Sequence, residues 1–188
     1  MHSFKRHWGL WLTAVLLFIL FVSSSMTYKE QTTVPLMERL LQSEPFKPFL
    51  STIHFDYAGE TQSVAEVGYF KFVEFFIRKG AHVTIFFLLG LGLTQGTFMY
   101  QKNRWLHWPL VTLSCTGIAA FDEFHQMLTG GRTPLFQDVM LDTVAAAIAV
   151  TVMWGWLWWR KRRVKRFSTL TVNSIKHASE NWTRDDPD

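Results

Sequence analysis

The strongest constraint on this chain is the run WGLWLTAVLLFILFVSSS, which extends from Trp8 to Ser25 without a single charged residue. A helix needs about 20 mainly apolar residues to cross a hydrocarbon core about 30 Å thick. Hydrophobic residues make up 48% of the chain, yet its mean hydropathy is close to zero. Polar residues must therefore be concentrated between apolar segments, which favours an integral membrane protein over a soluble domain.

Four segments approach the length of a membrane span. They lie at about residues 8–25, 80–99, 105–126 and 139–159. The third is the least uniform, because it contains Pro109 and ends in three ionisable residues. The fourth ends in WGWLWW, which is typical of an aromatic belt at a membrane surface. We therefore predict an all-α fold, a four-helix membrane bundle with a helical extracytoplasmic segment between the first two spans.

The first apolar run has a second interpretation. Lys5 and Arg6 precede it and VSSS ends it, as in a cleaved signal peptide. The length of the run and its aromatic content favour a retained anchor, and both readings stay open.

The distribution of Lys and Arg predicts the orientation of the spans. Cations occur at the amino end, at Lys102 and Arg104 between the second and third spans, and in RKRRVKR at 160–166. With four spans these three regions share one side, which the positive-inside rule makes cytoplasmic. Both chain ends are then cytoplasmic.

The carboxyl-terminal block favours one kind of partner. RKRRVKR holds six cations and no acid, and such a block beside a span indicates contact with anionic lipid rather than nucleic acid. We predict a membrane domain at residues 1–159 and a basic, disordered cytoplasmic tail at 160–188. The single cysteine, Cys115, has no partner for an intramolecular disulfide.

The segment between the first two spans is long and mixed in charge. VPLMERLLQS at 34–43 has leucines on one face and predicts a short helix on the membrane surface. The pattern from Ser63 to Met99 is helical almost throughout, which is longer than a bilayer is thick. The part before Gly80 must therefore project, bend or lie flat.

Ionisable residues at three helix ends converge on the outer face in this topology. Within each helix, pairs of these residues are four apart, so each pair shares one side of its helix. Three helices can thus direct polar side chains to one pocket. The candidate site residues are Arg78, Lys79, His82, Asp122, Glu123, Gln126, Arg132, Asp138 and Asp142.

Several roles fit such a group. Three cations facing four acids can form an ion-pair network that braces the helices. A metal site would use His82, His125 and the acids, but fixed ligand spacing is missing and the nearby cations oppose it. We therefore predict no metal and no cofactor.

Three functional roles remain open beside bracing. An enzyme acting on an envelope lipid or glycan would use His82 and Glu123 as an acid/base pair, but no known nucleophile motif accompanies them. A transporter would need charge at mid-span, whereas this charge lies near one surface. Binding fits better, because Arg and Lys hold phosphate or carboxylate while the acids and Gln126 accept amides or hydroxyls.

At these residues the sequence resembles the VanZ-like family of bacterial membrane proteins. The resemblance covers about residues 70–150. It includes RKGAH as an R-K-x-x-H span start, DEFHQ as D-E-x-x-Q, GGR, and Asp138 opening the last span. The family is named for a protein that lowers susceptibility to teicoplanin. The resemblance implies a multi-pass protein of the bacterial cell membrane that affects envelope or antibiotic susceptibility.

The chain departs from the family pattern at three positions. Asp142 stands where the family usually has Asn, and Ala145 and Ala149 replace frequent glycines. The extra acid weakens any transfer of ligand preference. The expected partners are membrane lipids and a cell-wall precursor or glycopeptide-like ligand, with no nucleic acid; the sequence does not give the oligomeric state.

Overall fold

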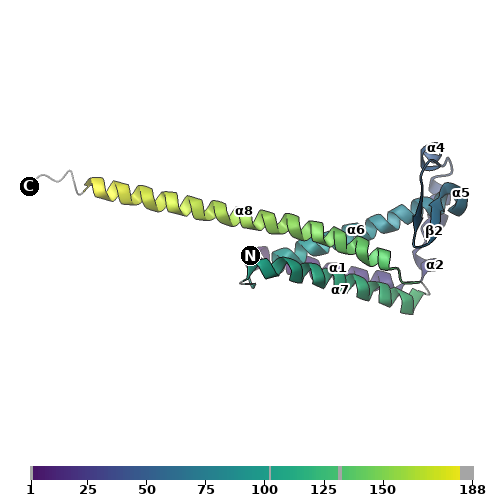
Figure 1. Cartoon of the computed structure of the whole chain (residues 1–188), viewed down its shortest axis with the longest axis horizontal. Helices are drawn as coiled ribbons and strands as arrows, with labels where there is room; N and C mark the ends of the chain where they lie inside the picture. Colours follow the sequence, from purple (N-terminus) through teal and green to yellow (C-terminus); the bar gives the residue numbers. More distant parts are fainter. Residues whose placement is uncertain (1, 102, 131–132, 183–188) are drawn as a thin grey trace, which may run out of the picture.

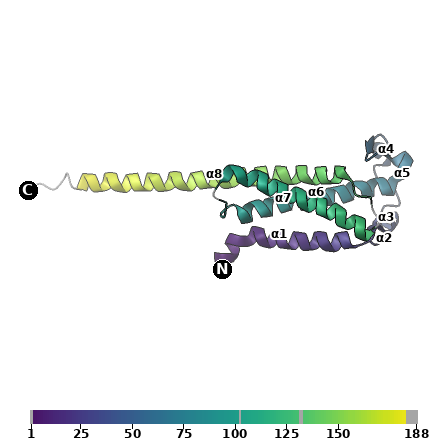
Figure 2. The same cartoon turned by 60° about the horizontal axis from the view of Figure 1, so that its bottom comes forward.

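A computed structural model describes residues 2–101, 103–130 and 133–182, and most of these residues are helical, as the sequence predicted. Four long helices pack side by side (Figures 1 and 2). They are α1 (His2–Ser25), α6 (Tyr69–Thr97), α7 (Arg104–Gly130) and α8 (Phe136–Trp182). α6 contacts each of the other three, and α7 also contacts α1 and α8.

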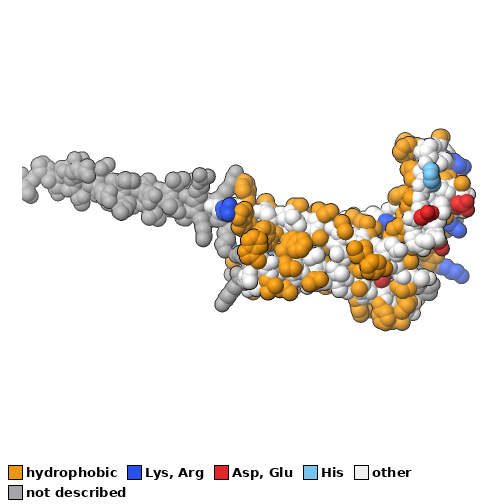
Figure 3. Space-filling model, viewed as in Figure 1, with side chains coloured by type: hydrophobic (Ala, Val, Ile, Leu, Met, Phe, Trp, Pro, Cys, Tyr) orange, Lys and Arg blue, Asp and Glu red, His pale blue; other side chains and the backbone are white. Residues whose placement is uncertain are grey.

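Three of these helices are long and apolar enough to cross a membrane: His7–Ser25 of α1, all of α6, and Phe136–Arg160 of α8. α7 is not among the candidates, because ionisable and hydroxyl side chains recur along it and lower its hydropathy. The membrane character predicted from the sequence is thus confirmed, while a fourth span stays a prediction. In Figure 3 hydrophobic side chains cover most of the visible bundle surface.

The bundle core combines large apolar side chains with small ones. Phe86, Leu89, Cys115, Ala146 and Val150 are fully buried within it. Small residues let α6 and α8 approach closely, as helices in membranes commonly do. A Cβ added at Gly90 would lie 2.8 Å from the backbone oxygen of Ala146, so this crossing requires glycine.

A compact cap, residues 26–68, joins α1 to α6. It contains the short helices α2 (Tyr28–Gln31), α3 (Val34–Leu40), α4 (Lys47–Leu50) and α5 (Val64–Val67). Figure 1 shows the cap at the end of the bundle opposite the projecting part of α8. α3 overlaps the surface helix that the leucine pattern predicted.

The cap also contains a β-hairpin, which the sequence analysis did not predict. Strands β1 (His54–Tyr57) and β2 (Glu60–Ser63) pair antiparallel, with Tyr57 opposite Glu60. Ala58 and Gly59 form the turn with φ angles of 56° and 83°, as two-residue hairpin turns require. The strands are four residues long with little apolar alternation, so they give a weak sequence signal.

The hairpin rests on the first turns of α6. Phe55 contacts the rings of Phe72, Phe75 and Phe76, and Phe72 is fully buried. The first turns of α6 therefore extend into the cap, as the length of the helical pattern required. Gly68, with φ of 83°, separates α5 from α6.

α8 continues to Trp182 as one helix of 47 residues, where the sequence analysis expected a disordered tail. Neither Gly nor Pro occurs between 156 and 182, so nothing in the sequence interrupts the helix started in the bundle. Figures 1 and 2 show this part of α8 projecting beyond the other helices.

Two glycines in α6 give a matched test of the close helix crossing. Gly→Ala gains about 1 kcal/mol of helix propensity at either position. Gly80 has open space around its added Cβ, whereas Gly90 meets backbone of α8, and overpacking costs about 1–3 kcal/mol. We expect Gly90→Ala to lower the unfolding temperature in detergent and Gly80→Ala to preserve or raise it. Equal shifts would contradict the close crossing.

Candidate functional site

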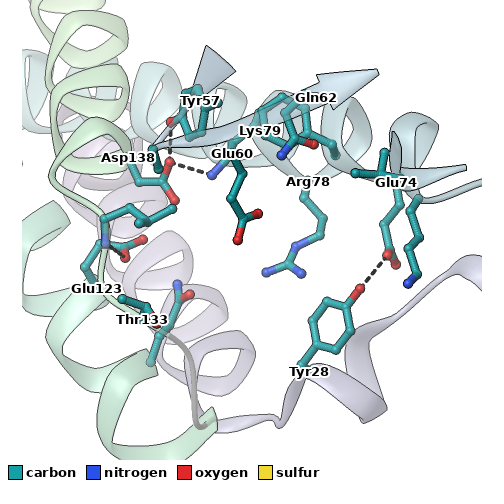
Figure 4. Close-up of a pocket in the computed structure, with 16 residues that line it drawn as sticks. Tyr28, Tyr57, Glu60, Gln62, Glu74, Arg78, Lys79, Glu123, Thr133 and Asp138 are labelled. Carbon is teal, nitrogen blue, oxygen red and sulfur yellow. Dashed lines mark hydrogen bonds and ion pairs between the residues drawn. The ribbon is translucent and has the colours of Figure 1, made fainter. Parts of the chain in front are cut away.

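A cavity of about 500 Å³ lies where α6, α7 and α8 meet the hairpin (Figure 4). Its wall contains three cations and four carboxylates, together with the polar side chains of Tyr28, Tyr57, Gln62 and Gln126. The charged residues are Lys71, Arg78, Lys79, Glu60, Glu74, Glu123 and Asp138. Charges of both signs make the cavity suited to a polar group rather than to an apolar one.

Asp138 connects three elements at one side of the cavity. Its Oδ1 accepts hydrogen bonds from Lys79 Nζ on α6, at 2.5 Å, and from the Tyr57 hydroxyl of the hairpin. The Lys79 ammonium also lies 4.9 Å from the centroid of the Tyr57 ring and 5.5 Å from that of Phe75. Lys79 is therefore held between the Asp138 carboxylate and two aromatic rings.

The Tyr57 hydroxyl is a stable donor. Burial raises the pKa of this phenol well above its ordinary value, and the hydrogen bond to Asp138 raises the pKa further. The proton stays on Tyr57 at neutral pH, so the hairpin remains hydrogen-bonded to α8.

Glu123 forms the α7 wall of the cavity and is only 7% exposed. Its Oε2 accepts the backbone N–H of Leu135 at 3.1 Å, just before α8 begins. Among the described residues no cation lies within ion-pair distance of this carboxylate.

A deeper group of polar side chains, the inner cluster, joins all four long helices. His82 Nδ1 lies 3.4 Å from Asp142 Oδ2 and 4.0 Å from Asp122 Oδ2. Asp122 also accepts hydrogen bonds from the Ser24 hydroxyl of α1 and from Gln126 Nε2, the latter at 2.8 Å. Ser24, Asp122, Gln126 and Asp142 are buried, and His82 is half-buried.

Glu74 fastens the cap to α6. It is 2% exposed, and its two oxygens accept hydrogen bonds from the Tyr28 hydroxyl at 3.1 Å, the Thr32 hydroxyl at 2.9 Å and the Thr33 backbone N–H at 2.6 Å. The guanidinium carbon of Arg78 lies 5.2 Å from the centroid of the Tyr28 ring. The Glu74 contacts thus fix the ring against which Arg78 stacks.

The residues proposed from the sequence fall into two adjacent groups. Arg78, Lys79, Glu123, Gln126 and Asp138 line the cavity. His82, Asp122 and Asp142 belong to the inner cluster and do not line it, although Gln126 connects the two groups. Arg132 lies outside the described residues.

Sequence reasoning missed six side chains of the candidate site: Ser24, Tyr28, Tyr57, Glu60, Lys71 and Glu74. Glu74 had a usable signal, because it is a lone acid within FVEFF and such an acid needs partners when buried. Ser24, Tyr28 and Tyr57 are neutral side chains whose contacts are tertiary, and Glu60 and Lys71 are exposed charges, so no local pattern marks these five.

His125 packs against aromatic rings of α1 and α7. Its ring stacks on Phe21 and Phe121, with centroids 5.1 Å and 6.2 Å apart. In the described ranges of the chain, no group of three or more His, Cys, Asp or Glu residues is arranged to hold a metal ion.

Comparison with known proteins identifies one family. The family model described as VanZ/LLP1 matches residues 9–160, which include most of α1, the cap, α6, α7 and the bundle part of α8. No curated protein and no solved structure matches the chain. The family resemblance drawn from the span-end residues is therefore confirmed over a longer region than those motifs cover.

A double-mutant cycle at Lys79 and Asp138 tests whether this pair holds the cavity together. Removing one partner leaves a partly buried charge, so Lys79→Met and Asp138→Asn should each destabilise the protein, and the double variant should show a coupling of about 0.5–3 kcal/mol. The exposed pair Lys47–Glu44 is the matched control, with an expected coupling below about 1 kcal/mol. Both coupling energies are obtained from free energies of unfolding in detergent. Similar couplings for the two pairs would contradict a bracing role for Lys79 and Asp138.

Proposed function

Because the chain belongs to the VanZ/LLP1 family, we propose that it is a four-span protein of the bacterial cell membrane whose cavity binds a polar headgroup. Both chain ends are cytoplasmic and the cap is outside in this proposal. The ligand is an envelope lipid, a cell-wall precursor or a glycopeptide-like molecule. Its binding alters envelope or antibiotic susceptibility, including susceptibility to teicoplanin.

Exposed apolar side chains support a membrane crossing by α7. Leu106, Leu113, Phe121 and Leu128 are 49–65% exposed along its length. A helix that packs beside three apolar helices and presents leucines outward is suited to lipid. The polar residues that lower its hydropathy, such as Thr112, Asp122 and Gln126, are buried within the bundle instead.

The position of Arg78 is the observation that carries the binding proposal. Its side chain lines the cavity, and Figure 4 shows the guanidinium reaching into that space. Among the described residues no carboxylate lies within 4.0 Å of it. A guanidinium presents donors in a planar fork that matches phosphate or carboxylate, so an anionic group would complete its contacts.

One contact favours the alternative of a membrane-embedded enzyme. His82 Nδ1 faces the Asp142 carboxylate at 3.4 Å, and an acid that orients a histidine is a common catalytic pairing. Glu123 lines the cavity but His82 does not, which supports binding over catalysis. Mass spectrometry of lipids and wall precursors from deletion and overexpression strains would reveal a changed product if catalysis occurs.

Cysteine labelling tests the proposed topology. In a Cys115→Ala background, His54→Cys marks the hairpin and Tyr100→Cys marks the connection between α6 and α7; both native side chains are exposed. We expect a membrane-impermeant maleimide to label position 54 in intact cells and position 100 only after permeabilisation. The reverse pattern would put the cap and its cavity in the cytoplasm.

Replacement of Arg78 tests the binding function in cells. We expect expression of the wild-type chain to lower teicoplanin susceptibility of a sensitive host and Arg78→Gln to lose this effect, because the ligand's anionic group loses its charged donor. Arg39→Gln on exposed α3 is the matched control. Susceptibility and membrane abundance are measured together.

The outcomes separate binding from bracing. Loss of effect at unchanged abundance supports the proposal. Loss of abundance in Arg78→Gln would favour a bracing role, and full activity of this variant would exclude Arg78 from the ligand site.

A further inference from the structure

The charges that line the cavity are only partly satisfied within the protein. Lys79 and Asp138 pair with each other, and Glu74 accepts hydrogen bonds from the cap. The remaining lining charges are two cations and two carboxylates. They are Lys71, Arg78, Glu60 and Glu123, and none of them forms an ion pair with another described residue.

The remaining acids are poorly suited to a purely anionic ligand. Glu123 is nine-tenths buried, and one of its oxygens already accepts the N–H of Leu135. Glu60, on the hairpin, is exposed and lines the same cavity. Both carboxylates would repel a phosphate or carboxylate placed against them. A buried carboxylate without a cation is costly, and a ligand donor would offset that cost.

The chemistry that would satisfy Glu123 is an ammonium group. An ammonium has three donors and a positive charge, and its hydrogen bonds to a carboxylate are charge-assisted and strong. Lys79 is not within ion-pair distance of Glu123; its ammonium pairs with Asp138 and lies over the Tyr57 and Phe75 rings. Arg78 stacks on Tyr28, on the cap side of the cavity.

We infer that the cavity takes a zwitterionic ligand, whose phosphate or carboxylate binds Arg78 and whose primary ammonium binds Glu123 with help from Glu60. This inference rests on the proposed binding function and names the chemical class of its ligand. An aminophospholipid headgroup and a peptide end that carries an amine and a carboxylate share this chemistry. Anionic lipids without an ammonium fit less well.

Native mass spectrometry of the full chain in detergent tests the inference. The probes are short-chain phosphatidylethanolamine, short-chain phosphatidylglycerol, soluble glycerophosphoethanolamine and the dipeptide alanyl-alanine. We expect phosphatidylethanolamine to bind about tenfold or more tightly than phosphatidylglycerol, because only the former offers a charged donor to Glu123. The two soluble probes distinguish a lipid headgroup from a peptide end.

Substitutions test which residues of the cavity bind each charged group of the ligand. Glu123→Gln retains an oxygen for the N–H of Leu135, so the fold is preserved, and it should remove the preference for the ammonium-bearing probe. Glu60→Gln, at an exposed position, should weaken the same preference without affecting folding. Arg78→Gln should weaken every probe, and Glu38→Gln on the exposed face of α3 is the matched control.

The results separate this inference from the function on which it rests. Equal binding of the two lipids, or a preference that Glu123→Gln and Glu60→Gln leave unchanged, would overturn the zwitterionic ligand while Arg78-dependent binding would still support the proposed function. If no probe binds in an Arg78-dependent way, the binding function itself fails.

Discussion

The pairing of Lys79 with Asp138 is the interaction on which the polar end of this bundle depends. Helices α6 and α8 carry these charges on side chains that are only 22% and 14% exposed, so each charge is stabilised by a partner within the protein. Asp138 also accepts the Tyr57 hydroxyl, which draws the hairpin over the helix ends. The pair and the Tyr57 hydrogen bond thus connect α6, α8 and the hairpin at one side of the cavity.

In the proposed function, bracing and binding belong to different residues of one polar group. The inner cluster ties α1, α6, α7 and α8 through Ser24, His82, Asp122 and Asp142. Arg78 and Glu123 line the cavity, and neither has an ion-pair partner among the residues that the structure describes. A ligand that binds there meets groups already held in position, which reduces the ordering cost of binding.

The sequence predicted the parts of this architecture that depend on local patterns. Apolar length located the long helices, and four-residue spacing put Asp122 and Gln126 on one face, where they hydrogen-bond. Residue spacing did not reveal that Lys79 pairs with Asp138 beside the cavity, whereas His82 faces Asp142 in the inner cluster. The hairpin was missed because its stability comes from Phe55 against α6, a contact between segments that no local pattern encodes. Ser24 was missed for the same reason: its partner lies on another helix.

Asp142, which departs from the family pattern, lies in the inner cluster. Asp142 is 2% exposed and faces His82, and it does not line the cavity. As a carboxylate it can only accept, so it favours a proton on Nδ1 of His82, whereas Asn at this position could also donate. The extra acid thus acts on the histidine of the inner cluster. In the proposed binding function, ligand preference would depend instead on Arg78 and Glu123, which belong to the motifs that this chain shares with its family.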